Sequence, residues 1–206
     1  MPRVCCHPRV ESLPVPRPRV FELMWEAYVA GTIPVGAVLV DGAGQIVAEG
    51  RNRIFDEPRD GQLAATRLAH AEINALVGLS PEHRYPYTTL YSALEPCHLC
   101  LAAATSSRIG GVRYAACDPY GGAVGRLLPS EDMRVHPLVV EGPLEGAAGL
   151  FPELLHLRHM LWRVPDGPGV VPFYRREHPD LIALALRLPE PPAASTLGEA
   201  LATVIE

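Results

Sequence analysis

Lysine is absent from this sequence. Its 206 residues include 18 basic side chains, all of them arginine, against 23 acidic ones, which gives a formal net charge of −5 at pH 7. This acidic balance argues against a nucleic-acid-binding surface over the whole protein, although a local basic groove is compatible with it. The sequence also lacks any apolar run near the ~20 residues that span a bilayer, and its N-terminus lacks the continuous apolar stretch of a signal peptide. We therefore expect a soluble, cytoplasmic protein without a membrane partner.

Cysteine is too scarce for a disulfide framework. The chain has five cysteines, and such usage fits a reducing compartment. The single C-x-x-C pair, Cys97 and Cys100, is not followed by the second ligand pair that a structural zinc site with four protein ligands would need. Cys5 and Cys6 lie among prolines near the terminus and are not expected to form another metal site, and Cys117 is expected in the core.

Two short motifs carry the chemistry, His70-Ala71-Glu72 and Pro96-Cys97-His98-Leu99-Cys100. His70, Cys97 and Cys100 offer one imidazole and two thiolates, which zinc prefers, and three protein ligands leave the fourth position open for water. A redox cysteine pair is the alternative, but it would explain neither His-Ala-Glu nor the proline. Pro96 indicates a helix that starts at Cys97, with both cysteines on one face. His70 and Glu72 are interpreted as the first turn of another helix.

The spacing H-x-E followed by P-C-x-x-C is the signature of zinc-dependent nucleobase deaminases. Zinc lowers the pKa of a bound water to roughly 7, so that hydroxide is available at neutral pH. Glu72 is not needed as a ligand, and we predict that it is the catalytic acid–base group. It would take the water's proton, pass it to the ring nitrogen and later protonate the departing ammonia.

The order of patterns along the chain predicts an open α/β sheet with helices on both faces. A proline-rich arm over residues 1–18 precedes a helix over residues 19–30 with an apolar stripe. Apolar or β-branched runs then predict strands, and the longer periodic segments predict helices. The expected strands cover residues 35–40, 46–50, 88–94, 111–116 and 135–140, and the expected helices between and after them cover residues 70–77, the segment from Cys97, 150–161, 180–188 and 195–205.

Two loops and the C-terminal part are candidates for substrate selection. The polar loop of residues 54–68 directly precedes the metal-binding helix and is a candidate lid, and residues 118–122 form a turn-rich loop at the end of a strand. Residues 19–142 are expected to form the zinc domain. Residues 143–206 are expected to form a helical extension, packed on this core or on a partner subunit.

On these residues the chain resembles the cytidine deaminase-like superfamily, and within it the branch of tRNA-adenosine, guanine and cytosine deaminases. The resemblance covers roughly residues 19–141. It implies a three-layer α/β/α fold with a central mixed sheet of about five strands, a bound Zn²⁺ and a homodimer. It also implies substrate contacts by Asn52, Ala71 and Asp118, although Asn52 could instead be only a turn residue. The matching segments are Ile33-Pro34-Val35-Gly36-Ala37-Val38, Asn52, His70-Ala71-Glu72, Leu94-Glu95-Pro96-Cys97-His98-Leu99-Cys100 and Ser107-Arg108-Ile109.

The departures from that branch concern the substrate. The tRNA enzymes of the branch carry a lysine and a Gly-Ala-Ala-Gly-Ser run after the aspartate, where this chain has the sequence Pro119-Tyr120-Gly121-Gly122-Ala123-Val124-Gly125-Arg126. Without lysine, binding to an anticodon loop loses much of its usual phosphate contact. We therefore predict deamination of a small nucleobase or nucleoside. The alternatives are a tRNA-specific adenosine-to-inosine deaminase and a catalytically idle protein that binds zinc and a nucleoside. Purine and pyrimidine substrates are not distinguished.

Overall fold

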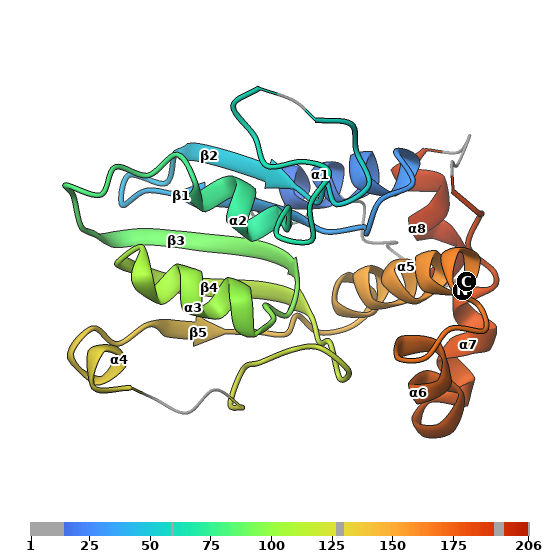
Figure 1. Cartoon of the computed structure of the whole chain (residues 1–206). Coiled ribbons are helices and arrows are strands. Elements are labelled where there is room, and N and C mark those ends of the chain that lie inside the picture. Colours follow the sequence, from blue (N-terminus) through green and yellow to red (C-terminus); the bar gives the residue numbers. More distant parts are fainter. Residues whose placement is uncertain (1–14, 59, 127–129, 192–195, 206) are drawn as a thin grey trace, which may run out of the picture.

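Five strands form one mixed sheet in the computed structural model, which describes residues 15–58, 60–126, 130–191 and 196–205 (Figure 1). The spatial order is β2-β1-β3-β4-β5. β1 pairs antiparallel with β2 and β3, whereas β3–β4 and β4–β5 are parallel pairs. The predicted α/β class and five-stranded mixed sheet are confirmed. The strands are β1 (Gly36–Val40), β2 (Ile46–Arg51), β3 (Tyr85–Leu94), β4 (Ile109–Ala116) and β5 (Val139–Glu141).

Helices cover both faces of this sheet. α1 (Arg17–Val29) and α5 (Ala147–Arg163) share one apolar core with one set of strand side chains, and α2 (Ala71–Leu76) and α3 (His98–Ser106) share the other. Alternate residues of a strand point to opposite faces. Accordingly, Val38 packs on the α1 side and Leu39 on the α2 side. Every residue of β1 is buried, as its continuous apolar run predicts.

Two glycines let helix backbones lie directly on the strands. A Cβ atom at Gly36 would lie 2.4 Å from the carbonyl oxygen of Val20 in α1. A Cβ atom at Gly50 in β2 would lie 2.4 Å from the carbonyl oxygen of Ala71. Only glycine permits such approaches, and the contact at Gly50 fixes where α2 begins.

Several predicted boundaries were wrong: β3 and β4 begin at Tyr85 and Ile109 instead of residues 88 and 111, and α7, which begins at Pro179, ends at Ala185 instead of residue 188. Two further differences lie near the edges of the domain. α1 begins at Arg17 instead of residue 19, because Pro18 lies in the first turn, where its missing N–H costs nothing. β5 begins at Val139 instead of residue 135, because the preceding segment forms α4 (Glu131–Val135). Ser130 caps that helix by accepting a hydrogen bond from the Met133 N–H at 3.3 Å. Of the predicted arm over residues 1–18, residues 1–14, with Cys5 and Cys6, lie outside the described residues, and residues 17 and 18 belong to α1.

The C-terminal extension packs on the domain over the face that α1 covers. The rings of Phe21 in α1 and Phe151 in α5 stack with centroids 6.4 Å apart. The Arg158 Nε–H donates to the carbonyl of Leu188 at 2.9 Å, and the Tyr28 hydroxyl donates to the carbonyl of Pro189. Beyond α5 the extension contains α6 (Val170–Glu177), which the sequence reading missed, α7 (Pro179–Ala185) and α8 (Leu197–Ile205). Within the described ranges, no helix combines the length and apolar character that crossing a bilayer requires.

Candidate metal and catalytic site

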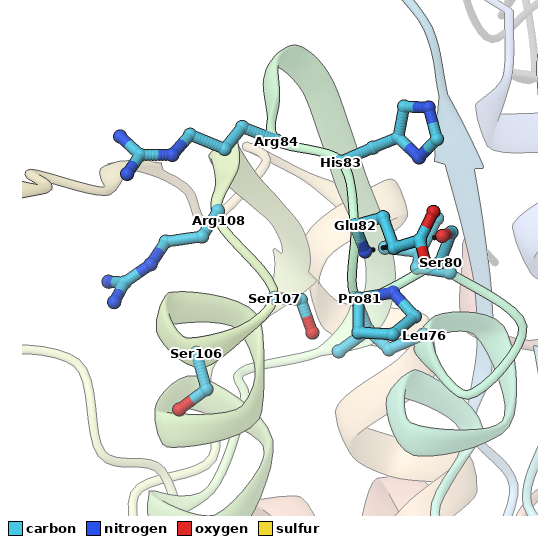
Figure 2. A pocket seen from close by; sticks show the side chains of 10 residues that line it. Leu76, Ser80, Pro81, Glu82, His83, Arg84, Ser106, Ser107 and Arg108 are labelled. Atoms are coloured by element: carbon cyan, nitrogen blue, oxygen red, sulfur yellow. Dashed lines mark hydrogen bonds between the residues drawn. The ribbon is translucent and has the colours of Figure 1, made fainter.

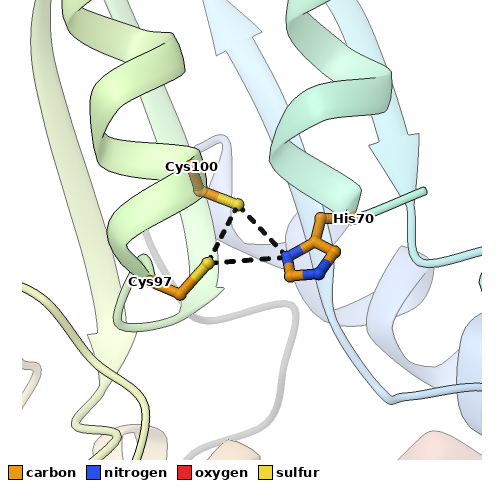
Figure 3. A group of neighbouring side chains, drawn as sticks. All are labelled: His70, Cys97 and Cys100. Atoms are coloured by element: carbon orange, nitrogen blue, oxygen red, sulfur yellow. Dashed lines mark hydrogen bonds between the residues drawn. The ribbon is translucent and has the colours of Figure 1, made fainter. Parts of the chain in front are cut away.

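The three predicted metal ligands come together where α2 and α3 begin (Figure 3). His70 and Cys97 are the residues just before these helices, and both have extended backbone. The predicted helices therefore began one residue too early, at His70 and Cys97 instead of Ala71 and His98. Cys100 lies in the first turn of α3, so its sulfur points to the same side as that of Cys97. Two helix N-termini thus meet at one point and present three side chains to it.

The separations of the donor atoms fit a zinc ion. The two sulfurs lie 3.7 Å apart, and the His70 Nδ1 lies 3.7 Å from Cys97 Sγ and 3.4 Å from Cys100 Sγ. Tetrahedral zinc, with its usual bond lengths to sulfur and nitrogen, places such atoms roughly 3.8 Å and 3.5 Å apart. Within the described part of the chain, no fourth side chain joins the cluster. A site of three protein ligands keeps one position for a non-protein ligand, which distinguishes a catalytic from a structural centre.

The local electrostatics prepare Cys97 as a ligand. Hydrogen bonding from the Cys100 thiol, followed by that from His70, lowers the pKa of Cys97 to about 3. The same Cys97–His70 contact raises the pKa of His70. The N-terminus of α3 adds a positive potential that favours the thiolate. Cys97 is therefore a thiolate at neutral pH, the form that binds metal.

Glu72 lies beside the ligand set in the first turn of α2 and is 4 % exposed. Its Oε1 accepts a hydrogen bond from the Ser92 hydroxyl at 2.9 Å, and its Oε2 lies 3.3 Å from the Cys100 sulfur. Burial raises the pKa of Glu72, which moves this carboxyl toward the range in which it both accepts and returns a proton. Ser92 was missed by the sequence reading. The sequence offered one signal for it, because Ser92 is a single hydroxyl residue beside the apolar residues Ala93 and Leu94 at the end of β3.

The residues assigned to substrate binding have local partners. The Oδ1 atom of Asn52 accepts hydrogen bonds from the Thr32 hydroxyl at 2.8 Å and the Ile54 N–H at 3.1 Å. Ala71 is fully buried between His70 and Glu72. The Oδ1 atom of Asp118 accepts from the N–H groups of Tyr120 and Gly121 at 3.1 and 2.8 Å, which shapes its loop. The substrate contacts of Asn52, Ala71 and Asp118 stay predictions.

Glu95 joins the loop after β4 to the metal-binding segment, a role that the sequence reading missed. Its carboxylate accepts hydrogen bonds from the Asp118 N–H at 3.2 Å and the Val124 N–H at 3.0 Å. The Ala123 N–H also donates to the carbonyl of Pro96 at 2.9 Å. The loop that carries Asp118 is therefore held against the residues that lead into Cys97.

A separate hollow of about 490 Å³ lies at the opposite ends of α2 and α3 (Figure 2). Its lining comes from the C-terminal ends of these helices and the segments that follow them, whereas the metal ligands lie at the N-terminal ends. The hollow is therefore distinct from the cluster of predicted metal ligands. It is lined by Leu76, Leu79, Ser80, Pro81, Glu82, His83, Arg84, Ser106, Ser107 and Arg108.

A family model matches residues 18–116, and its description is the zinc-binding region of cytidine and deoxycytidylate deaminases. The matched region contains Asn52, Glu72 and the whole metal cluster. Asp118 and the C-terminal extension follow it.

Two curated relatives show how far the similarity reaches. The tRNA-specific adenosine deaminase of Bacillus subtilis is 37% identical over 125 residues, which are 58% of this chain and 73% of that protein. The tRNA(Ile)-lysidine synthase of Deinococcus radiodurans is also 37% identical over 125 residues, which are 56% of this chain. The match spans only 20% of that longer protein.

The fold is shared with a solved guanine deaminase from Nitrosomonas europaea. That structure superimposes with a TM-score of 0.51 over 71% of this chain and 85% of the other, at 24% sequence identity. The similarity confirms the predicted fold, including the arrangement of the sheet and its helices.

Proposed function

Since this chain belongs to the family of cytidine and deoxycytidylate deaminases with a zinc-binding region, we propose that it hydrolyses an amino group from a nucleobase or nucleoside. In that reaction water replaces the exocyclic amine on a ring carbon. The products are the corresponding oxo compound and ammonia.

The observation that carries the proposal is the placement of Glu72. Its carboxylate is buried next to three metal ligands, yet it is not one of them. Zinc held by these ligands would supply an activated water for the attack. Glu72, whose Oε2 lies 3.3 Å from the Cys100 sulfur, would take one proton from that water and pass it to the ring nitrogen. It would then carry the second proton, from the hydroxyl added to the ring carbon, to the leaving amine. The Ser92 hydroxyl holds one carboxylate oxygen, so the other is oriented toward the ligand set.

We infer a small base or nucleoside as substrate, in preference to a nucleic acid. The chain has no lysine and a formal charge of −5, so the phosphate contacts that hold an RNA loop are reduced. The loop after Asp118 also differs from that of the tRNA-acting members of the family.

A second candidate is deamination of adenosine in a tRNA loop. The relative from Bacillus subtilis that shares 37% identity acts, by its name, on tRNA adenosine. An RNA substrate would reveal itself by an affinity that falls steeply as salt is added. The third candidate is a catalytically inactive protein that binds zinc and a nucleoside. The presence of Glu72 argues against it, because binding alone does not need a proton carrier.

Two further expectations belong to this proposal. We infer a homodimer, as the resemblance to the family implies, and a cytoplasmic location. Light scattering of the purified protein at several concentrations tests the first, and a monomeric mass throughout would contradict it.

The deciding experiment measures ammonia release by the zinc-loaded protein. The panel contains guanine, adenine, cytosine, their nucleosides, amino-triazines and an adenosine-bearing anticodon stem-loop. Turnover of a small molecule with an inert stem-loop supports the first candidate, and turnover of the stem-loop alone supports the second. No turnover of any compound by zinc-loaded protein would overturn the deaminase proposal for these substrates.

Two variants separate the chemistry from metal binding. Glu72→Ala is expected to keep stoichiometric zinc and to lose turnover, whereas Cys97→Ala is expected to lose both. Glu82→Ala is the matched control, because Glu82 is exposed and lies at the far ends of the helices. Normal turnover by Glu72→Ala would exclude the acid–base role.

A further inference from the structure

Asn52 lies beside the start of α2, next to the first predicted metal ligand. The N–H of the following residue, Arg53, donates to the carbonyl of Ala69 at 2.9 Å. Two residues before Asn52, Gly50 lies so close to α2 that a Cβ atom there would be 2.4 Å from the carbonyl oxygen of Ala71. Ala69 and Ala71 are the two neighbours of the histidine of the metal cluster. The contacts on both sides of Asn52 therefore place it against the metal-binding segment.

Three of the four polar groups of Asn52 have partners within the protein. Its backbone N–H donates to the carbonyl of Val35 at 2.9 Å, and its backbone carbonyl accepts from Nη1 of Arg51 at 2.9 Å. Its side-chain oxygen, Oδ1, accepts from the Thr32 hydroxyl at 2.8 Å and from the Ile54 N–H at 3.1 Å. The side-chain NH₂ group has no hydrogen-bond partner among the residues that the structure describes. Since buried polar groups are rarely left unpaired, this donor is available for a ligand.

The two donors to Oδ1 decide which end of the amide is left unpaired. A backbone N–H cannot accept a hydrogen bond, so the atom that the Ile54 N–H contacts must be the amide oxygen. The Thr32 hydroxyl contacts the same oxygen and must therefore donate as well. Asn52 is 2 % exposed, and its Nδ2 atom is not among the unpaired polar atoms that the described part of the chain encloses completely. A small ligand can therefore reach the NH₂ group.

The end of α5 contacts the sequence neighbours of both donors. Thr32 is fully buried, and the Trp162 ring lies 3.6 Å from where a Cβ atom would be at Gly31, the residue before it. The Arg163 guanidinium lies over the ring of Phe55 at 3.5 Å from the centroid, and Phe55 follows the second donor in the sequence. The C-terminal extension therefore helps to hold the two groups that orient Asn52.

We propose that Thr32 is a positioning residue of the substrate site, because its hydroxyl holds the Asn52 amide with the NH₂ group toward the substrate. Asn52 then donates to an acceptor of the substrate ring, either a carbonyl oxygen or an unprotonated ring nitrogen. Without the Thr32 hydroxyl, Oδ1 is held by one hydrogen bond instead of two, so the NH₂ group is placed less strictly. This inference rests on the proposed function and on the predicted substrate contact of Asn52. It assigns the orientation of that contact to a residue outside the metal motifs.

The test compares Thr32→Val with Thr32→Ser in the full, zinc-loaded chain. Valine keeps the shape of threonine and removes the hydroxyl, whereas serine keeps the hydroxyl. With the best substrate of the panel above, Thr32→Val should raise KM roughly fivefold and change kcat by less than about twofold. Thr32→Ser should keep KM within about twofold of the wild type. An unchanged KM in Thr32→Val, or an equal rise in both variants, would overturn the proposal.

A matched control removes a hydroxyl elsewhere in the same domain. The Thr105 hydroxyl is also buried and donates to the carbonyl of Leu101 at 3.0 Å, at the end of α3 away from the metal ligands. Thr105→Val should therefore leave KM unchanged. A rise in KM equal to that of Thr32→Val would show that the loss of any buried hydroxyl has this effect, and would overturn the proposal.

A double-variant cycle tests whether Thr32 acts through Asn52. If it does, Thr32→Val should add nothing once the amide is absent, so the KM of the double variant should equal that of Asn52→Ala within about twofold. Effects of the two substitutions that multiply would show that Thr32 acts independently of Asn52, and would overturn the proposal.

Binding measured without turnover separates this inference from the proposed function. The side-chain ¹H–¹⁵N resonances of Asn52, assigned by their loss in Asn52→Ala, are followed while guanine, adenine or cytosine is added to the zinc-loaded protein. Shifts in the wild type and in Thr32→Ser that are smaller in Thr32→Val at the same base concentration support the inference, even if no base is deaminated. Resonances that stay fixed with every base overturn it, and observed deamination would then leave the proposed function standing.

Discussion

The two neighbours of Glu72 decide how its carboxylate is oriented and how far its pKa is raised. Its two oxygens have different neighbours, the Ser92 hydroxyl on one side and the Cys100 sulfur on the other. The hydroxyl supplies a hydrogen bond to the charged form, which opposes the effect of burial on the carboxyl pKa. Ser92 therefore both orients the carboxylate and limits how far its pKa rises.

We expect Ser92→Ala to lower kcat about 10-fold while zinc content stays unchanged. A hydrogen bond to a charged group contributes about 1.5–3 kcal/mol. Without the Ser92 hydroxyl, Glu72 is less well oriented in the transition state, and the part of this energy that orientation supplied raises the activation barrier. The measurement is steady-state kinetics with metal analysis of the same sample. Ser106→Ala, at an exposed position of α3, is the control. A normal kcat would show that Ser92 does not position Glu72.

His159 makes the stability of the protein depend on pH. Burial, followed by the charges of His156 and Arg163, lowers its pKa to about 3, whereas an unfolded histidine has a pKa near 6.5. Between these values the unfolded chain binds the proton and the folded chain does not, so stability falls as the pH drops from about 6.5 toward 3. We expect His159→Gln, which does not titrate, to reduce this loss. Urea unfolding of both proteins at pH 7 and pH 4.5 measures the difference, and equal losses would contradict the prediction.

The residues of the metal centre were predictable because their chemistry is local in the sequence. His70 with Glu72, and Cys97 with Cys100, lie two or three positions apart at the starts of α2 and α3, so their types and spacing carry the information. Ser92 was not predictable in the same way. Its contact with Glu72 depends on how β3 lies beside α2, and no short motif encodes that register.

At the scale of the elements, the contact of β2 with α2 sets the position of His70. In Gly50→Ala the new methyl carbon would lie only 2.4 Å from the Ala71 carbonyl oxygen. This distance is shorter than a van der Waals contact, so α2 must shift. Overpacking of this kind costs about 1–3 kcal/mol. We expect a lower urea midpoint and weaker zinc affinity, measured by competition with a chelating dye. Gly78→Ala, where a Cβ meets nothing within 4 Å, is the control. Unaltered zinc affinity would show that α2 tolerates the shift.

Elements with strong periodicity were predicted better than those with short or polar sequences. β1 and α5 follow from long apolar patterns, whereas α4 and α6 did not appear in the sequence reading. The signals for α4 were its serine cap and the acidic residues Glu131 and Asp132 in the first turn. α6 follows a proline-rich segment, and its helical state depends on packing of Phe173 and Tyr174 against distant residues.

For the whole molecule, removing the metal should destabilise the fold. A ligand that binds only the native state adds about 4 kcal/mol at a thousandfold excess over its Kd, which corresponds to roughly 10 °C in Tm for a chain of this size. We expect a chelator to lower Tm by about that amount and zinc to restore it. Hydrogen exchange should increase first at the N-terminal turns of α2 and α3. A Tm that is insensitive to chelation would show that the cluster is not a native-state zinc site.

The position of β3 has a consequence for how the chain acquires its metal. β3 is the central strand of the sheet, and it lies between His70 and Cys97 along the sequence as well as between the antiparallel and parallel parts in space. The ligand set is therefore incomplete until β3 has inserted between β1 and β4, a non-local step that is slow in folding. We therefore expect a newly synthesised chain to bind metal late, after the sheet has formed. The zinc content of a sample would then equal the fraction of its molecules that have completed folding.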